Sequence, residues 1–167
     1  QTKESADLFL ILMIHLLKDG GRAGIVLPDG SLTGEGVKQR VREELLTKCN
    51  LHTIIRLPNS VFQPYATVAT NLLFFEKGKK TKEVWYYEHR LPEGQKSYSK
   101  TKPIQAKEFD PIKKWWNIRK ESDVCWKVDM KTIIDRNYDL DIKNPTQQAE
   151  EKEYSTSELL SILDRSF

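Results

Sequence analysis

The sequence contains few cysteines, methionines and histidines. Its 167 residues include two cysteines, two methionines and three histidines. Cys49 and Cys125 lie far apart with no Cys-x-x-Cys pair, and the histidines are isolated, so neither a metal site nor a disulfide framework is predicted. A reducing compartment, the cytoplasm, is the expected location.

Long apolar runs are also missing. No apolar run approaches the roughly 20 residues that span a bilayer, so the sequence does not predict a membrane protein. The length suits one domain with a core of its own. The chain begins with Gln1 instead of Met and shows no signal-peptide pattern, so we expect a piece of a longer protein.

The first part of the chain alternates helical and extended patterns. Residues 8–17 form an apolar run that glycines stop, and residues 22–27 read as a short buried strand that breaks at Pro28-Asp29-Gly30. An amphipathic helix follows, in which Val37, Val41 and Leu45 recur every four residues and which ends near Cys49-Asn50, and a strand over 52–57 comes after it. Because parallel neighbours need a crossover that is usually helical, this order predicts an α/β fold with parallel strands covered by helices.

The next strand is expected to reverse direction. Only about a dozen residues separate Leu57 from Asn71, they include Pro58 and Pro64, and they show no helical pattern. A connection of that kind is too short for a helical crossover. We therefore predict that the strand over 70–76 runs antiparallel to its predecessor.

Several segments together resemble a known family. They are Leu16 to Gly30 (LLKDGGRAGIVLPDG), Leu57-Pro58, Val61-Phe62, Thr70 to Gly78 (TNLLFFEKG), Glu83 to Tyr87 (EVWYY), Lys96 to Pro103 (KSYSKTKP) and Asn137 to Pro145 (NYDLDIKNP). This set, which covers most of the chain, is similar to the modification subunit of type I restriction-modification systems, an adenine-N6 DNA methyltransferase family.

The resemblance implies a fold and a domain plan. It implies the C-terminal half of a Rossmann-like methyltransferase sheet, with parallel strands and an antiparallel last strand, over residues 1–90. An irregular, aromatic-rich extension would cover 91–143, and a polar linker with a short helix would cover 144–167. A half-sheet of this kind would expose an apolar edge, so we expect the isolated chain to associate.

Two motifs of the family are missing. Its members hold S-adenosylmethionine with a glycine-containing motif and receive the adenine with an Asn-Pro-Pro-aromatic motif, and neither is present. Asn144-Pro145-Thr146 lacks the second proline and the aromatic residue. No catalytic residue is therefore assigned, the cofactor is expected to bind only in the full-length subunit, and the chain alone is expected to be inactive.

Three residues are candidates for the pocket of the target base. The resemblance places Phe62 where family members carry a ring that stacks on an extruded adenine, whereas the simpler alternative is an aromatic that plugs the core. Tyr65 would line the same pocket or merely contact solvent. Asp29 lies at the carboxyl end of its strand, where open α/β sheets bind ligands, although Asp-Gly is also common in turns.

The charge of +3 is unevenly distributed. Residues 77–102 hold eight Lys or Arg against three Glu, whereas residues 121–167 hold six against eleven acidic residues. The candidate DNA contacts are Lys77, Lys79, Lys80 and Lys82, whose cations could lie beside phosphates. The alternative for these lysines is a solvated hairpin turn that protects a sheet edge.

The second half suggests contacts with partners. Trp115, Trp116 and Trp126 are expected to pin loops onto the sheet, with a protein interface as the alternative. A capped apolar helix near the C-terminus, with Leu159, Leu160, Ile162 and Leu163, is expected to dock on this domain or on a partner. The family implies DNA, a specificity subunit and a restriction subunit as partners.

Three functions compete at this point. The favoured one is part of a site-specific adenine-N6 DNA methyltransferase subunit that uses S-adenosylmethionine. The alternative is a non-catalytic module for DNA binding or subunit assembly. A nicotinamide-dependent oxidoreductase is distant, because the sequence has no Gly-x-Gly-x-x-Gly.

Overall fold

The computed structural model describes residues 2–147 and 160–161. Its elements are α1 (Thr2–Leu16), β1 (Arg22–Pro28), α2 (Asp29–Leu32), α3 (Val37–Lys48), β2 (Cys49–Arg56), β3 (Thr70–Lys77), β4 (Glu83–Glu88), the 3₁₀ helix η1 (Ala106–Phe109), α4 (Asp110–Asn117), β5 (Cys125–Asp129) and α5 (Met130–Asp135). The predicted C-terminal helix lies outside the described residues, except for Leu160 and Ser161, which are helical. No described helix is long and apolar enough to cross a bilayer.

The five strands form one mixed sheet in the order β1-β3-β2-β4-β5. β3 runs antiparallel to both β1 and β2, β4 runs parallel to β2, and β5 runs antiparallel to β4. The predicted α/β class and the reversal of the return strand are confirmed. β1 and β2 run in the same direction, as predicted, but they are not neighbours in the sheet, because β3 lies between them.

The position of β3 follows from its composition. Its apolar run from Leu72 to Phe75 supplies Leu73 and Phe75 to the main core and Phe74 to the opposite face. A strand with apolar side chains on both faces is stable only in the interior of a covered sheet. β3 therefore pairs on both sides and lies between the two strands that precede it in the sequence.

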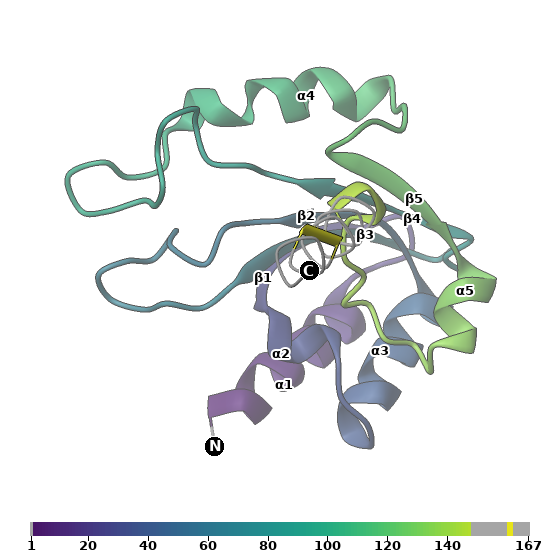
Figure 1. Cartoon of the computed structure of the whole chain (residues 1–167). Coiled ribbons are helices and arrows are strands. Elements are labelled where there is room, and N and C mark those ends of the chain that lie inside the picture. Colours follow the sequence, from purple (N-terminus) through teal and green to yellow (C-terminus); the bar gives the residue numbers. More distant parts are fainter. Residues whose placement is uncertain (1, 148–159, 162–167) are drawn as a thin grey trace.

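Helices cover both faces of the sheet (Figure 1). α1, α2 and α3 lie on one face, where Ile14 and Leu45 pack with Ile54 and Tyr86 in the main core. α4 lies on the other face, where Trp116 meets Phe74 edge-on at 5.0 Å between ring centroids. Successive side chains along a strand point to opposite faces of the sheet, so they pack in two separate apolar layers.

Part of the extension predicted to be irregular is regular. β5 joins the sheet, and Trp126 on it is buried and stacks on Tyr86 at 5.4 Å. Trp115 on α4 meets Trp85 at 5.8 Å. The described tryptophans therefore pack within the domain, as expected. The division into 1–90, 91–143 and 144–167 stays a prediction.

Candidate functional site

Three strands end at one edge of the sheet and deliver polar residues there. β1, β2 and β4 point the same way and are followed by Asp29, by the loop over residues 57–69 and by His89. This carboxyl edge is where open α/β sheets bind ligands. A cavity of about 390 Å³ opens there, and its lining includes Asp29, Arg56, Pro58, Glu88, His89, Arg90, Trp126, Lys143 and Asn144.

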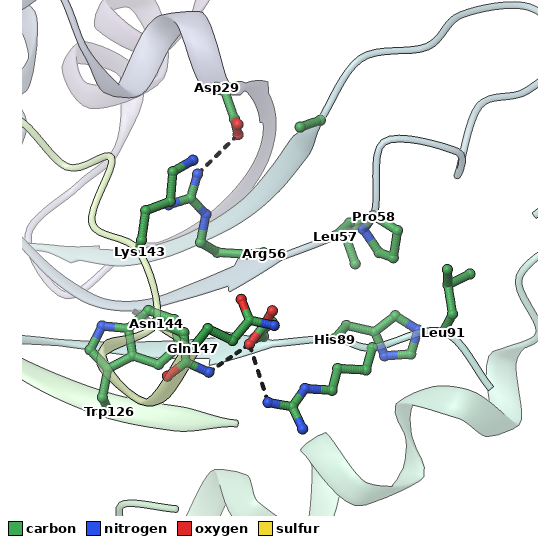
Figure 2. Close-up of a pocket in the computed structure, with 13 residues that line it drawn as sticks. Asp29, Arg56, Leu57, Pro58, His89, Leu91, Trp126, Lys143, Asn144 and Gln147 are labelled. Carbon is green, nitrogen blue, oxygen red and sulfur yellow. Dashed lines mark hydrogen bonds and ion pairs between the residues drawn. The ribbon is translucent and has the colours of Figure 1, made fainter. Parts of the chain in front are cut away.

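Asp29 lines this cavity but is also part of an ion-pair network (Figure 2). Its Oδ1 accepts hydrogen bonds from Asn71 Nδ2 at 2.7 Å and from a terminal nitrogen of Arg56 at 3.2 Å. Arg56 also donates to Asp141 Oδ1 at 2.6 Å and to the carbonyl of Ile142 at 3.0 Å. Asp29 therefore helps to orient Arg56, which binds residues 141–142 at the ends of β1 and β2.

The charge of Arg56 also acts on the second carboxylate. Burial alone would raise the pKa of Asp141, but the hydrogen bond and charge of Arg56, together with Lys143, hold that pKa below its ordinary value. The carboxylate form of Asp141 is thus favoured, and both acidic and basic side chains line the cavity beside it.

Phe62 and Tyr65 project from the loop over residues 57–69. Their exposed fractions are 44% and 85%, and neither ring pairs with another ring of the described residues. Ser60 is the only buried residue of the loop, so Ser60 and not Phe62 anchors it to the domain. The loop contributes Leu57, Pro58 and Ala69 to the cavity, and the structure leaves Phe62 and Tyr65 outside its lining.

The four candidate lysines lie at the opposite edge of the sheet. Lys77 pairs with Cys49, the first residue of β2, whereas the Phe62 loop follows the last residue. The eight residues of β2 separate the two edges by about 25 Å at roughly 3.3 Å per residue. The structure therefore does not bring the lysines and the proposed base pocket together.

The interpretation of this lysine segment as a hairpin turn was wrong. β3 and β4 are separated by β2, so residues 78–82 cross the end of β2. Lys79, Lys80 and Lys82 line a second cavity, of about 730 Å³, with His52 and Trp85 among others. Arg119 lines it too, with its guanidinium carbon 4.8 and 4.9 Å from the ring centroids of Trp115 and Trp116.

A buried hydrogen-bond network next to the loop was not predicted from the sequence. Tyr98 donates its hydroxyl to Glu108 Oε1 at 2.6 Å, and His89 Nε2 lies 2.8 Å from the same hydroxyl. All three side chains are largely buried. Burial lowers the pKa of His89, with the charge of Glu108 opposing the shift, and burial together with Glu108 raises the pKa of Tyr98.

The described residues provide no recognisable site for a cofactor or a metal ion. The turn after β1 is Pro28-Asp29-Gly30, which begins the four-residue helix α2, and no glycine-rich turn follows a described strand at the carboxyl edge. Among the described residues, no group of three or more His, Cys, Asp or Glu could hold a metal. The two cysteines are buried and free.

Comparisons with known proteins agree on one family. The family model for N-6 DNA Methylase matches residues 1–154. The methylase subunit of the type I restriction enzyme EcoEI from Escherichia coli is 53% identical over an alignment of 168 positions, which covers 96% of this chain and 34% of the relative. The chain thus spans about a third of the length of this curated relative.

Solved structures show the same likeness. A modification subunit assigned to a type I restriction enzyme of Vibrio vulnificus YJ016 has a TM-score of 0.78 and 42% identity, over 84% of this chain and 32% of that chain. A chain from a study of complex assembly and conformational transition in the type I R-M system has a TM-score of 0.78 and 36% identity, over 95% and 38%.

Proposed function

The chain belongs to the N-6 DNA methylase family, and from this premise we propose that it supplies part of the target-base pocket of a type I modification subunit. The full-length subunit would transfer a methyl group from S-adenosylmethionine to N6 of adenine in DNA. The observation that supports this role is the exposed Phe62 on a loop at the carboxyl edge, beside the cavity that Asp29 lines.

Phe62 would stack on the extruded adenine. Stacking needs an accessible flat ring, and the 44% exposure of Phe62 leaves its side chain available. Tyr65 would contact the same nucleotide from the outer part of the loop. Asp29 would border the pocket, with its carboxylate oriented by Arg56 and Asn71.

The rest of the machinery would come from outside this chain. The described residues do not fit a site for S-adenosylmethionine, so other parts of the full-length subunit would bind it. The proposed partners are DNA, a specificity subunit and a restriction subunit, and the proposed place of action is the cytoplasm. Alone, the chain would transfer no methyl group.

A second candidate function rests on the opposite edge. Lys79, Lys80 and Lys82 line the 730 Å³ cavity together with Arg119, and no described carboxylate pairs with these cations. With Lys77, they would make the chain a DNA-binding or subunit-assembly module. This function does not require Phe62, so the two proposals can be tested separately.

Replacement of Phe62 tests the favoured proposal. In the full-length subunit within its complex, Phe62→Ala should reduce methyl transfer by about 5- to 150-fold, because stacking of a base on an aromatic ring contributes roughly 1–3 kcal/mol. The assay follows a labelled methyl group into duplex DNA, and 2-aminopurine at the target position reports extrusion by its fluorescence. Phe62→Trp, which keeps a flat ring, should retain most of the activity.

The outcome is informative in both directions. Unchanged methylation in Phe62→Ala would remove the base-stacking role. Lost methylation with DNA binding and subunit assembly intact would support it. Tyr65→Ala and Asp29→Asn in the same assay show whether these two residues also contribute to the pocket.

A further inference from the structure

The loop proposed to hold the base has no charge of its own. Residues 57–69 contain no Lys, Arg, Asp or Glu, and their exposed large side chains are Phe62, Tyr65 and Val68. Duplex DNA carries one negative charge per roughly 1.7 Å of its axis, and proteins hold it mainly through cations. The cations that position DNA over this loop must therefore come from another segment.

Residues 91–105 form a second loop that lies against the first. Both loops project from the same side of the sheet, at the left of Figure 1. Tyr98 is the only buried residue of the second loop, as Ser60 is of the first. The backbone N–H of Tyr98 donates to Ser60 Oγ at 3.0 Å, so the single buried residue of each loop contacts the other.

The side chain of Tyr98 fastens the second loop to the domain. Its hydroxyl donates to Glu108 on η1. Because a hydroxyl has only one proton to donate, its oxygen accepts the second hydrogen bond from His89 Nε2–H. The backbone N–H of His89 in turn donates to the carbonyl of Arg56 at 2.9 Å. The second loop is thus tied to the ends of β2 and β4, the strands at the candidate site.

The second loop presents unpaired cations. It carries Lys96, Lys100 and Lys102 against one acid, Glu93, and all three lysines are exposed. A turn with two hydrogen bonds of 3.1 Å between Ser99 and Lys102 holds two of the lysines next to each other. The lysine ion pairs of the described residues involve other positions, namely Lys48, Lys113, Lys127 and Lys143.

We propose that residues 91–105 are a DNA-backbone contact, in which Lys96, Lys100 and Lys102 bind phosphates beside the target base. The Ser60–Tyr98 contact would fix their position relative to Phe62. This inference rests on the proposed function, because it takes the first loop as the base-contacting one. In this arrangement the phosphates nearest the target base are bound at the carboxyl edge of the sheet. Lys79, Lys80 and Lys82 lie about 25 Å away, at the opposite edge.

The test measures how DNA binding depends on salt. In the full-length subunit within its complex, the triple variant Lys96→Gln, Lys100→Gln, Lys102→Gln is titrated with labelled duplex by fluorescence anisotropy at several salt concentrations. Each phosphate contact contributes about 0.9 to the slope of log K against log salt. The triple variant should therefore bind more weakly, with a slope shallower by about 2 to 3, on any DNA sequence.

Two further variants make the test decisive. The triple Lys-to-Arg variant at the same positions keeps the charges and should keep both affinity and slope. If it loses as much as the Gln variant, or if the Gln variant binds normally, the inference is overturned. The triple Lys-to-Gln variant at positions 79, 80 and 82 removes the same charge at the opposite edge, and a loss of slope found only there also overturns it.

Other outcomes separate this inference from what it rests on. If Phe62→Ala methylates normally while the loop lysines still set the salt slope, the base-stacking role fails and the DNA contact stands. If Phe62→Ala loses methylation while the Gln variant keeps the slope, only the inference fails. Normal DNA binding with lost subunit assembly in the Gln variant would show a protein-binding loop and overturn the DNA contact.

Discussion

At the scale of single residues, two largely buried histidines link the stability of the domain to pH. Burial lowers the pKa of His52, and the nearby charge of Arg119 lowers it further. Burial also lowers the pKa of His89, against the opposing charge of Glu108. Both side chains therefore favour the neutral form in the folded chain more than in the unfolded chain, where the pKa is about 6.5.

The sign of the effect follows from proton binding. Below about pH 6.5 the unfolded chain binds more protons than the folded chain. The contribution of these histidines to the free energy of unfolding is therefore complete above that pH, and it is lost as the pH falls toward their pKa values in the folded chain. Urea unfolding at pH 7.5, 6.5 and 5.5 should show decreasing stability. The double variant His52→Gln, His89→Gln should lose most of this dependence, and an unchanged dependence would refute the assignment.

The sequence identified some residues of the candidate site and not others. Asp29 was predicted from its place after a strand, and the structure places it in the lining of the carboxyl-edge cavity. Arg56 gave no signal, because its partner Asp141 is 85 residues away and the contact depends on the folded sheet. The Tyr98 network was missed for the same reason, since a buried hydroxyl is identified only by the residues that surround it.

At the scale of elements, the two loops depend on one tyrosine. Tyr98→Phe removes a hydroxyl that binds both Glu108 and His89, so each of these largely buried groups loses one hydrogen bond, but the variant keeps the backbone bond to Ser60. The expected loss is about 1–3 kcal/mol in the free energy of unfolding, measured with urea. Tyr65→Phe, which removes a hydroxyl from a residue that is 85% exposed, should change it little. Equal stabilities of the two variants would contradict the role of Tyr98.

The order of strands shows what periodicity can and cannot predict. Short connections with prolines predicted the direction of β3, because they exclude a helical crossover. They did not predict its place between β1 and β2, since neighbours in a sheet need not be neighbours in sequence. The continuous apolar run of β3 was the available signal, because a run without alternation suits a strand covered on both faces.

At the scale of the whole molecule, no described residue covers the outer, apolar face of α1. α1 packs Leu10 and Ile14 into the core, yet Leu8, Leu12 and Leu16 recur every four residues on its outer side and are 64%, 50% and 73% exposed. Phe9 is exposed beside them. A helix that is apolar all round is normally buried on all sides, so this face should bind another apolar surface.

The isolated chain should therefore self-associate. Its sedimentation coefficient should rise with concentration, because the α1 face is apolar and β1 ends the described sheet with an unpaired edge. Phe9→Glu with Leu16→Glu should shift the chain to monomer by placing charges on that face. Ile118→Glu, at a 70% exposed position after α4, introduces the same kind of charge elsewhere and should leave association unchanged. If the unmodified chain stayed monomeric at every concentration, the apolar face of α1 would not drive self-association.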